Sequence, residues 1–114
     1  MITIEQNKQR LHATVFGEFT LADFREFEDA VMYRLEFDGQ VNLLLDLSEM
    51  GRYTIDTLWE DIRFGKQHPY AFERIAVVTQ SEWVGSLAWL SNMFAEAKVG
   101  VFHDAGEAEE WLAS

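Results

Sequence analysis

The 114-residue sequence contains no cysteine and only one proline, Pro69. Without cysteine the chain has no thiol nucleophile, forms no disulfide and cannot hold zinc or an iron–sulfur cluster through sulfur. One proline excludes a proline-rich linker, and a hydrophobic content of 48% excludes general disorder. We therefore expect a single compact domain over residues 1–114, because this length suits one domain and is too short for two.

Basic residues are scarce as well. The sequence has 9 Lys and Arg against 20 Asp and Glu, which gives a formal net charge of −11. Such a charge repels phosphate backbones and anionic lipid surfaces, so we expect no nucleic-acid partner. No apolar run is long enough to span a membrane, and Met1–Glu5 has neither the basic start nor the apolar core of a secretory leader. The expected location is the cytoplasm, without membrane insertion.

The stretch Val41–Leu47 is almost continuously apolar. A strand with one face in water would alternate, so this run predicts a strand that is covered on both faces, in the middle of a sheet. A second run without alternation, Glu73–Thr79, indicates a parallel neighbour. Polar residues begin at Asp46 and Ser48, and open α/β sheets place their sites beyond the carboxyl ends of strands. We expect the functional site there, on a loop that also carries Tyr53.

The opening of the chain predicts a hairpin and a helix. Alternation over Ile2–Glu5 and Arg10–Gly17 is typical of two paired strands. Thr20 and Asp23 have the spacing of a capping box at a helix start, and Gly39 is a suitable C-cap. The side chains predicted to be buried are Phe24, Phe27, Val31 and Leu35. The side chains predicted to face outward are Arg25, Glu28, Asp29 and Arg34.

The rest of the chain predicts alternating helices and strands. In order, these are a helix from Thr54 or Thr57 to His68, a helix from Ser81, a strand over Lys98–Phe102 and a helix from Asp104 that is anchored by Trp111 and Leu112. With the segments described above, the order is ββαβαβαβα. This order predicts an α/β fold with a mixed, mostly parallel five-stranded sheet and helices packed on it.

Charged side chains outside the central strand suggest chemistry of two kinds. On a continuing helix, Asp61 and His68 would share a face two turns apart. A carboxylate so placed can orient the imidazole for proton transfer, which is the basis of a hydrolase or lyase hypothesis. The structural alternative is that His68 interacts with the negative helix end while Asp61 is solvated. Arg74, at the start of a buried strand, pairs either with an anion or with one of the protein's own carboxylates.

Large hydrophobic side chains provide a second group of candidates. Trp59 and Trp83 stand near predicted helix starts at one edge of the sheet, where they either wall a pocket or close the core. Trp89 and Met93 fall outside the apolar stripe of the helix that follows Ser81. They therefore pack under a loop, line a ligand cavity or contact a second subunit, and we name them as candidates for self-association.

Metal and cofactor chemistry is not expected. His12, His68 and His103 lie on separate predicted elements, without the spacing of paired metal ligands. The sequence has no Gly-x-Ser-x-Gly turn and no glycine-rich phosphate loop. We therefore expect no metal, no cofactor and no assigned catalytic residue.

Weak patterns in a fixed order suggest a family. They are Gly17 with Asp23 and Phe24, Leu44-Leu45-Asp46-Leu47, Trp59-x-Asp61, Gly65 to His68, Arg74-x-Ala76-Val77-Val78, Trp83, and Ala108-x-x-Trp111-Leu112. Their order along nearly the whole chain resembles the SpoIIAA-like branch of the STAS superfamily. The resemblance implies a small α/β module that regulates or binds a protein partner.

One departure from the family pattern concerns phosphorylation. The STAS anti-sigma antagonists carry a phosphorylatable serine in an Asp-Ser-Ser-Gly turn after the third strand. At that place this sequence reads Gly51-Arg52-Tyr53-Thr54, so the resemblance implies a module without a phospho-switch. The branch is also similar to CRAL-TRIO lipid-binding domains, which implies a small apolar or lipid-like ligand as an alternative.

These observations lead to one expected function and two alternatives. We expect a non-catalytic cytoplasmic module that binds a partner protein or a second copy of itself, as a homodimer or larger assembly. The first alternative is a domain for a small apolar or lipid-like ligand. The second is a hydrolase or lyase that uses His68 and Asp61. The candidate ligand- or partner-binding residues are Asp46, Ser48, Tyr53, Trp59, Asp61, His68, Arg74 and Trp83.

Overall fold

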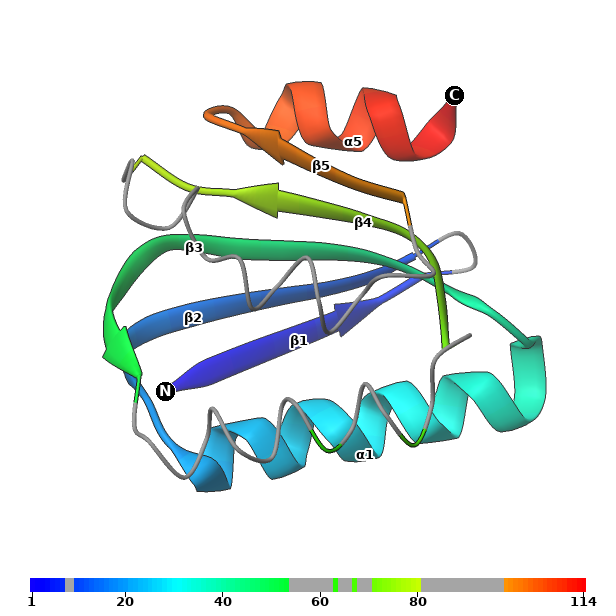
Figure 1. Ribbon diagram of the computed structural model, residues 1–114, viewed down its shortest axis with the longest axis horizontal. Coiled ribbons are helices and arrows are strands. Elements are labelled where there is room, and N and C mark those ends of the chain that lie inside the picture. Colours follow the sequence, from blue (N-terminus) through cyan, green and yellow to red (C-terminus); the bar gives the residue numbers. More distant parts are fainter. Residues whose placement is uncertain (8–9, 54–62, 64–66, 68–70, 81–97) are drawn as a thin grey trace.

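The structure is a computed structural model that describes residues 1–7, 10–53, 63, 67, 71–80 and 98–114. Five strands form one sheet in the order β1-β2-β3-β4-β5 (Figure 1). Only β1 and β2 are antiparallel, and the other neighbours are parallel. The prediction of a mixed, mostly parallel five-stranded sheet is therefore confirmed. The strands are β1 (Ile2–Gln6), β2 (Leu11–Phe19), β3 (Val41–Tyr53), β4 (Phe72–Val78) and β5 (Lys98–Phe102).

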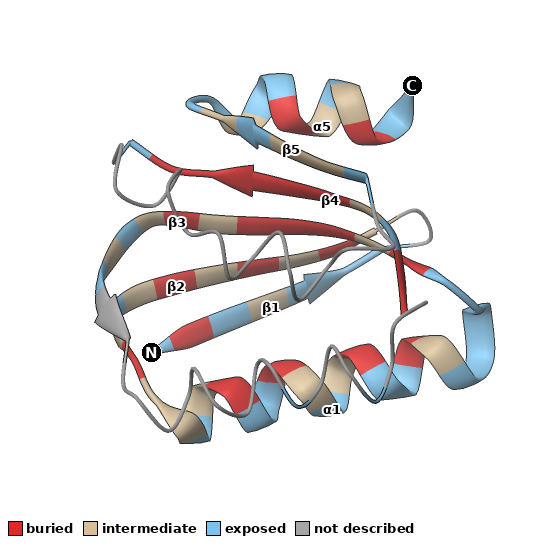
Figure 2. Ribbon diagram, viewed as in Figure 1, coloured by how far each residue is buried: buried red, intermediate tan, exposed pale blue. Residues whose placement is uncertain are grey.

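The central strand β3 is covered on both faces by helices. The helix α1 (Leu21–Asp38) lies against β1, β2 and β3, while α5 (Ala105–Ala113) lies against β3, β4 and β5. Leu43 and its neighbour Leu44 point to opposite faces, and both are 0% exposed. Leu43 belongs to the core under α1, and Leu44 packs with residues of α5. Figure 2 shows the resulting band of buried residues through the middle of the sheet.

The boundaries of α1 follow from its capping residues. The Thr20 Oγ1 accepts a hydrogen bond from the Asp23 N–H at 3.3 Å, and the Thr20 N–H donates to Asp23 Oδ2 at 3.0 Å. This reciprocal pair is a capping box, as predicted. At the other end, Gly39 has φ +84°, a conformation that favours glycine over residues with a Cβ atom. The predicted stripe is confirmed for Phe24, Phe27 and Val31, which are buried.

Arg34 corrects the prediction for the outward face of α1. Its side chain was expected in solvent, but the residue is only 6% exposed. Arg34 follows the buried Phe27 by two helical turns, so both side chains lie on one face. The guanidinium donates from Nη1 to the Arg10 carbonyl at 3.2 Å, and its Nε lies 3.6 Å from Asp38 Oδ2. The long apolar stem can therefore be buried because the charged end is hydrogen-bonded.

The closing helix α5 begins as predicted. Asp104 caps it, since its Oδ1 accepts a hydrogen bond from the Gly106 N–H at 3.1 Å. Ala108 and Leu112 are buried against the face of the sheet that holds Leu44. The Trp111 ring packs beside Phe102 of β5, with 5.6 Å between ring centroids.

The two helices predicted between the last three strands lie largely outside the described residues. Residues 63 and 67 are helical and exposed, in agreement with the helix predicted to end at His68. The helix predicted from Ser81 falls entirely outside the description. In the part of the chain that the structure describes, no helix is both long and apolar enough to cross a membrane.

Candidate functional site

The carboxyl end of β3 is longer than the sequence predicted. A loop was expected after Leu47, but β3 continues to Tyr53 and pairs with β2 up to its last residue, Phe19. Polar side chains do not prevent pairing, because the ladder is made by backbone groups and β2 supplies them beyond the end of β4. We call residues Asp46–Tyr53 the distal β3 segment. It contains Ser48 and the backbone of Tyr53, which were both predicted on a loop.

The distal β3 segment carries two irregularities. Between Asp46 and Glu49, β3 has one residue more than the facing part of β2, and it gains another between Met50 and Arg52. Extra residues of this kind are β-bulges, which bend a strand and redirect its side chains. Figure 1 shows the corresponding bend of β3 beyond the end of β4. Gly17 of β2, with φ +64°, faces the second irregularity and adopts a backbone conformation that suits glycine.

Asp46 and Ser48 form a local polar contact at the first bulge. Asp46 Oδ1 accepts one hydrogen bond from the Ser48 N–H at 3.0 Å and another from the Ser48 hydroxyl at 2.6 Å. Both residues are half-buried, while the next residue, Glu49, is exposed. The carboxylate therefore satisfies the amide that the bulge displaces and holds the hydroxyl in one direction. Leu47 and Met50, three residues apart, both reach the core under α1 because of the extra residue.

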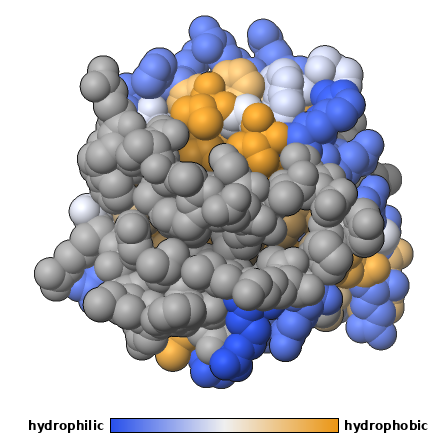
Figure 3. All heavy atoms as spheres, viewed as in Figure 1, coloured by the Kyte–Doolittle hydropathy of each residue, from blue (hydrophilic) through white to orange (hydrophobic). Residues whose placement is uncertain are grey.

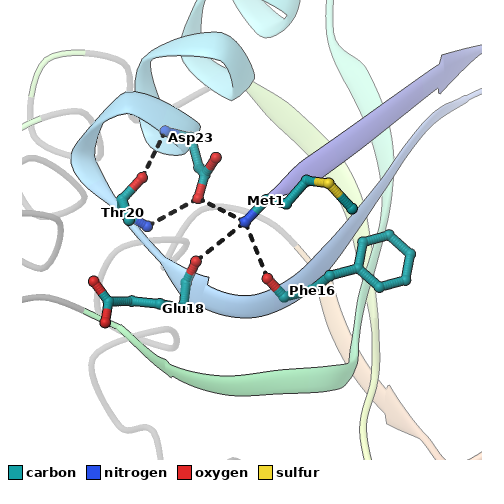
Figure 4. Close-up of polar contacts among 5 residues, drawn as sticks. All are labelled: Met1, Phe16, Glu18, Thr20 and Asp23. Atoms are coloured by element: carbon teal, nitrogen blue, oxygen red, sulfur yellow. Dashed lines mark hydrogen bonds and ion pairs between the residues drawn. The ribbon is translucent and has the colours of Figure 1, made fainter.

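A second polar cluster lies where β2 leads into α1, beside the distal β3 segment. The amino nitrogen of Met1 is 3.0 Å from the Phe16 carbonyl oxygen, 3.3 Å from that of Glu18 and 3.2 Å from Asp23 Oδ2 (Figure 4). Burial raises the pKa of the Asp23 carboxyl, but hydrogen bonds from the Thr20 N–H and the Met1 amino group outweigh it and leave this pKa below its usual value. Asp23 is therefore held as a carboxylate that joins the hairpin to the helix.

Arg74 lies away from this edge. It is next to Asn42 in the sheet, four residues before Asp46 along β3, so the structure does not bring Arg74 to Asp46 or Ser48. Its Nη1 donates to the Trp111 carbonyl at 2.9 Å and to the carbonyl and hydroxyl oxygens of Ser114, each at 3.1 Å. The guanidinium carbon is 5.4 Å from the centroid of the Trp111 ring. Arg74 thus holds the C-terminal end of α5.

Most other predicted site residues fall outside the described part of the chain. They are Trp59, Asp61, His68, Trp83, Trp89 and Met93, together with the side chain of Tyr53. Their proposed roles remain predictions. Within the residues that the structure describes, no three His, Asp or Glu side chains are grouped so that they could hold a metal ion.

Sequence reasoning missed three features. His103 Nδ1 lies 2.9 Å from the Thr79 carbonyl oxygen and so joins the carboxyl ends of β4 and β5. The first β3 bulge was also missed, because nothing in the residue types reports an extra residue in a ladder. Tyr33 and Phe37 form a third feature, an exposed aromatic pair on α1. Their spacing of four residues, outside the buried stripe, was the signal that could have revealed them.

Solved structures with the same fold include two proteins that are described as anti-sigma factor antagonists. One is SpoIIAA in its unphosphorylated form, with a TM-score of 0.69, 8% identity, and coverage of 100% of this chain and 99% of that one. The other is an anti-sigma factor antagonist from Mycobacterium paratuberculosis, with a TM-score of 0.64, 16% identity, and coverage of 100% and 94%. At these identities the likeness shows the fold alone.

A further structure and a family comparison agree with this fold. An uncharacterized protein of the DUF3478 family from Shewanella loihica PV-4, described as having a SpoIIAA-like fold, has a TM-score of 0.79 and 23% identity, with coverage of 98% of this chain and 92% of that one. A search of curated proteins gave no match. The family model described as SpoIIAA-like matches residues 10–113, nearly the whole chain. The chain therefore belongs to the SpoIIAA-like family.

Proposed function

We propose that this protein is a non-catalytic regulatory module of the cytoplasm that binds a partner protein through the distal β3 segment, without a phospho-switch. The single domain proposed for it spans residues 1–114. Membership of the SpoIIAA-like family and a fold shared with two anti-sigma factor antagonists support a regulatory role. This relationship supports the class of function, and the geometry of β3 supports the position of the binding surface.

The observation that carries the proposal is the bulged geometry around Asp46 and Ser48. Bulges are frequent beside functional sites, since they turn side chains away from the regular alternation of a strand. Here the bulge leaves Glu49 exposed at the end of the sheet while Leu47 stays in the core. The surface is therefore formed by a strand segment that is hydrogen-bonded to β2, which favours a preformed binding site over one that folds on contact.

The same contact argues against phosphorylation of Ser48. Its hydroxyl donates to Asp46 at 2.6 Å, so a phosphoryl group on that oxygen would place its charge directly beside a carboxylate. Like charges at this distance repel, and the donated hydrogen bond would be lost as well. With Gly51-Arg52-Tyr53-Thr54 in place of the family's serine turn, we propose that binding at this edge is constitutive.

Site-specific photo-crosslinking in cells tests the surface. A photoreactive residue at the exposed Glu49 should give a discrete adduct with one protein, which mass spectrometry identifies in repeated experiments. The matched control position is Glu73, also exposed but at the opposite end of the sheet. Adducts that are equal at both positions, or absent at Glu49, would contradict the proposal. Intact mass of the purified protein tests the second half, because a phosphoryl group on Ser48 would refute constitutive binding.

A separate experiment tests whether the partner is a second copy of the chain. Trp89 and Met93 are the residues proposed for self-association, and both lie outside the described part of the structure. Light scattering over a dilution series, repeated on Trp89→Glu, measures this association directly. A monomer at every concentration, unchanged by the substitution, would remove self-association and leave the separate partner protein. The apolar-ligand and hydrolase or lyase alternatives gain no support from the described residues.

A further inference from the structure

The outer face of α1 exposes a pair of aromatic rings. Tyr33 is 60% exposed and Phe37 is 65% exposed, although each has a large apolar surface. They are one helical turn apart, and their rings pack together with 4.7 Å between centroids and an angle of 47° between planes. Figure 2 shows this C-terminal end of α1 as exposed, and Figure 3 shows hydrophobic residues among hydrophilic ones on that side.

Acidic side chains surround the aromatic pair. Asp29 precedes Tyr33 by one turn, Glu36 follows it by almost one turn, and all of them are exposed. Asp38 is exposed at the end of the helix. The basic residue of this stretch, Arg34, is buried; it donates to the Arg10 carbonyl, and its Nε lies 3.6 Å from Oδ2 of the 63% exposed Asp38. The last turn of α1 contains no basic residue.

Apart from the ion pair between Asp38 and Arg34, these side chains add little to the stability of the fold. Aromatic rings in water forgo the gain from burial, and carboxylates in a last helical turn face the negative end of the helix dipole. A bound cation would interact favourably with both the rings and the carboxylates. It can pair with Glu36 and Asp38, approach the last helical carbonyls and stack on the rings. The apolar area needs apolar contacts as well. An occupant with alternating cationic and apolar side chains fits this chemistry.

Charge also decides against other occupants. A second copy of the chain would bring the same carboxylates to the contact, and the chain's net charge of −11 adds a long-range repulsion. Anionic lipid surfaces and nucleic acids are disfavoured for the same reason. A cationic segment of another protein is attracted at long range and held by the aromatic pair at short range.

We propose that Asp29, Tyr33, Glu36, Phe37 and Asp38 form an aromatic–acidic surface that binds a cationic amphipathic segment of a partner protein. This surface is distinct from the distal β3 segment. The helix α1 begins at the end of the sheet where β2 finishes, and it stops at the end where β3 begins. Its C-terminal turn therefore lies at the opposite end of the sheet from Ser48. The protein would then contact partner chains at both ends of its sheet.

The test uses a defined probe, a labelled synthetic helical peptide built from leucine and arginine, with fluorescence anisotropy at physiological salt. The double variants Tyr33→Gln/Phe37→Gln and Asp29→Asn/Glu36→Gln should each raise the Kd about tenfold, the range seen when interface anchors are removed. The charge-matched control is Glu5→Gln/Glu110→Gln, two exposed carboxylates on β1 and α5. Val101→Ser, at a valine that is 53% exposed on β5, is the apolar control. Both controls should change the Kd less than about threefold.

Three results would overturn the proposal. A leucine–glutamate peptide that binds as tightly as the leucine–arginine peptide would remove the role of charge. Equal weakening by the α1 and control carboxylate variants would show diffuse attraction by an acidic protein. Dimerisation in light scattering that the Tyr33→Gln/Phe37→Gln variant abolishes would assign the face to a second copy. Because the crosslinking at Glu49 probes the other edge, each proposal can fail without the other.

Discussion

At the residue scale, Asp23 shows how one carboxylate couples the hairpin to the first helix. Its Oδ2 accepts from the Thr20 N–H at 3.0 Å and lies 3.2 Å from the Met1 amino nitrogen. The side chain is 13% exposed. These partners lower its pKa in the folded protein below the ordinary value of 3.8, despite the opposing effect of burial.

The pH dependence of stability follows from this shift. A folded pKa that lies below the unfolded one stabilises the protein above the unfolded value, and the stabilisation is lost as the pH falls through the folded value. We expect the free energy of unfolding of Asp23→Asn to fall less between about pH 6 and about pH 3 than that of the wild type. Urea unfolding at a series of pH values measures this difference. Parallel pH profiles for the two proteins would show that Asp23 contributes nothing to acid sensitivity.

A second prediction at this scale concerns the contribution of Arg34 to stability. Arg34→Met keeps much of the apolar stem but loses the hydrogen bond to the Arg10 carbonyl. We expect a loss of about 1–2 kcal/mol in the free energy of unfolding, since the bond has a charged donor and is shielded from water. Asp38 remains 63% exposed and solvated, so no buried charge is left behind. Arg25→Met, at an exposed position of the same helix, is the control and should change stability by less than about 0.5 kcal/mol. Equal effects would place Arg34 in solvent.

At the scale of elements, two arginines hold α5: Arg10 pairs with Glu109 at 2.6 Å, and Arg74 binds the C-terminal end. Arg74 reaches from β4 to the Trp111 carbonyl and lies over the Trp111 ring. A cation at a helix C-terminus and over an indole stabilises the helix through the dipole, a hydrogen bond and a cation–π contact. Arg74 therefore links the C-terminal end of α5 to β4, in addition to the buried contacts of Leu112.

Substitution of Arg74 should therefore release α5 before the rest of the fold. We expect Arg74→Ala to cost about 1–2 kcal/mol, the sum of a charged hydrogen bond and a partly exposed cation–π contact. Hydrogen exchange followed by mass spectrometry should show that the substitution accelerates exchange, relative to the wild type, more in Ala105–Ala113 than in β3. Lys98→Ala is the matched control, because Lys98 is an exposed cation beside Arg74 in the sheet. Unchanged exchange in α5 would mean that its buried face and the ion pair between Arg10 and Glu109 fix the helix without Arg74.

The same scale shows which elements sequence reasoning can and cannot predict. Val41–Leu47 was predicted correctly because burial on both faces leaves a run of apolar residues. The loop predicted after Leu47 was wrong, because the strand continues to Tyr53 through backbone pairing with β2, a neighbour that residue types do not reveal. Arg34 was placed outside because polarity was taken to mean exposure, whereas a long side chain can bury its stem.

For the molecule as a whole, the sequence indicated two polar residues that follow an apolar strand, but not the backbone geometry that holds them. Asp46 and Ser48 were expected where the strand gives way to a loop, but both lie within β3, which continues to Tyr53; Asp46 pairs with Val78, the last residue of β4. Their mutual hydrogen bond depends on a bulge. The bulge arises where β3 has one residue more than the facing part of β2. Tyr33 and Phe37 of the aromatic–acidic surface were missed because the prediction for the outward face of α1 considered only charged side chains, among them Asp29.

The charge of the whole molecule gives the last prediction. With a net charge of −11, the folded chain holds its carboxylates closer together than the unfolded chain does, and their mutual repulsion opposes folding. At 0.1 M salt, interactions between exposed charges more than about 10 Å apart are largely screened. Salt therefore weakens this repulsion more than it weakens the short ion pair of the buried Arg34. We expect the thermal midpoint to rise as sodium chloride increases from about 0.01 M to about 0.3 M. Calorimetry measures the midpoint, and Glu5→Lys/Glu110→Lys should reduce its dependence on salt because each substitution removes two units of excess negative charge. A midpoint that falls with salt would mean that favourable ion pairs outweigh the repulsion.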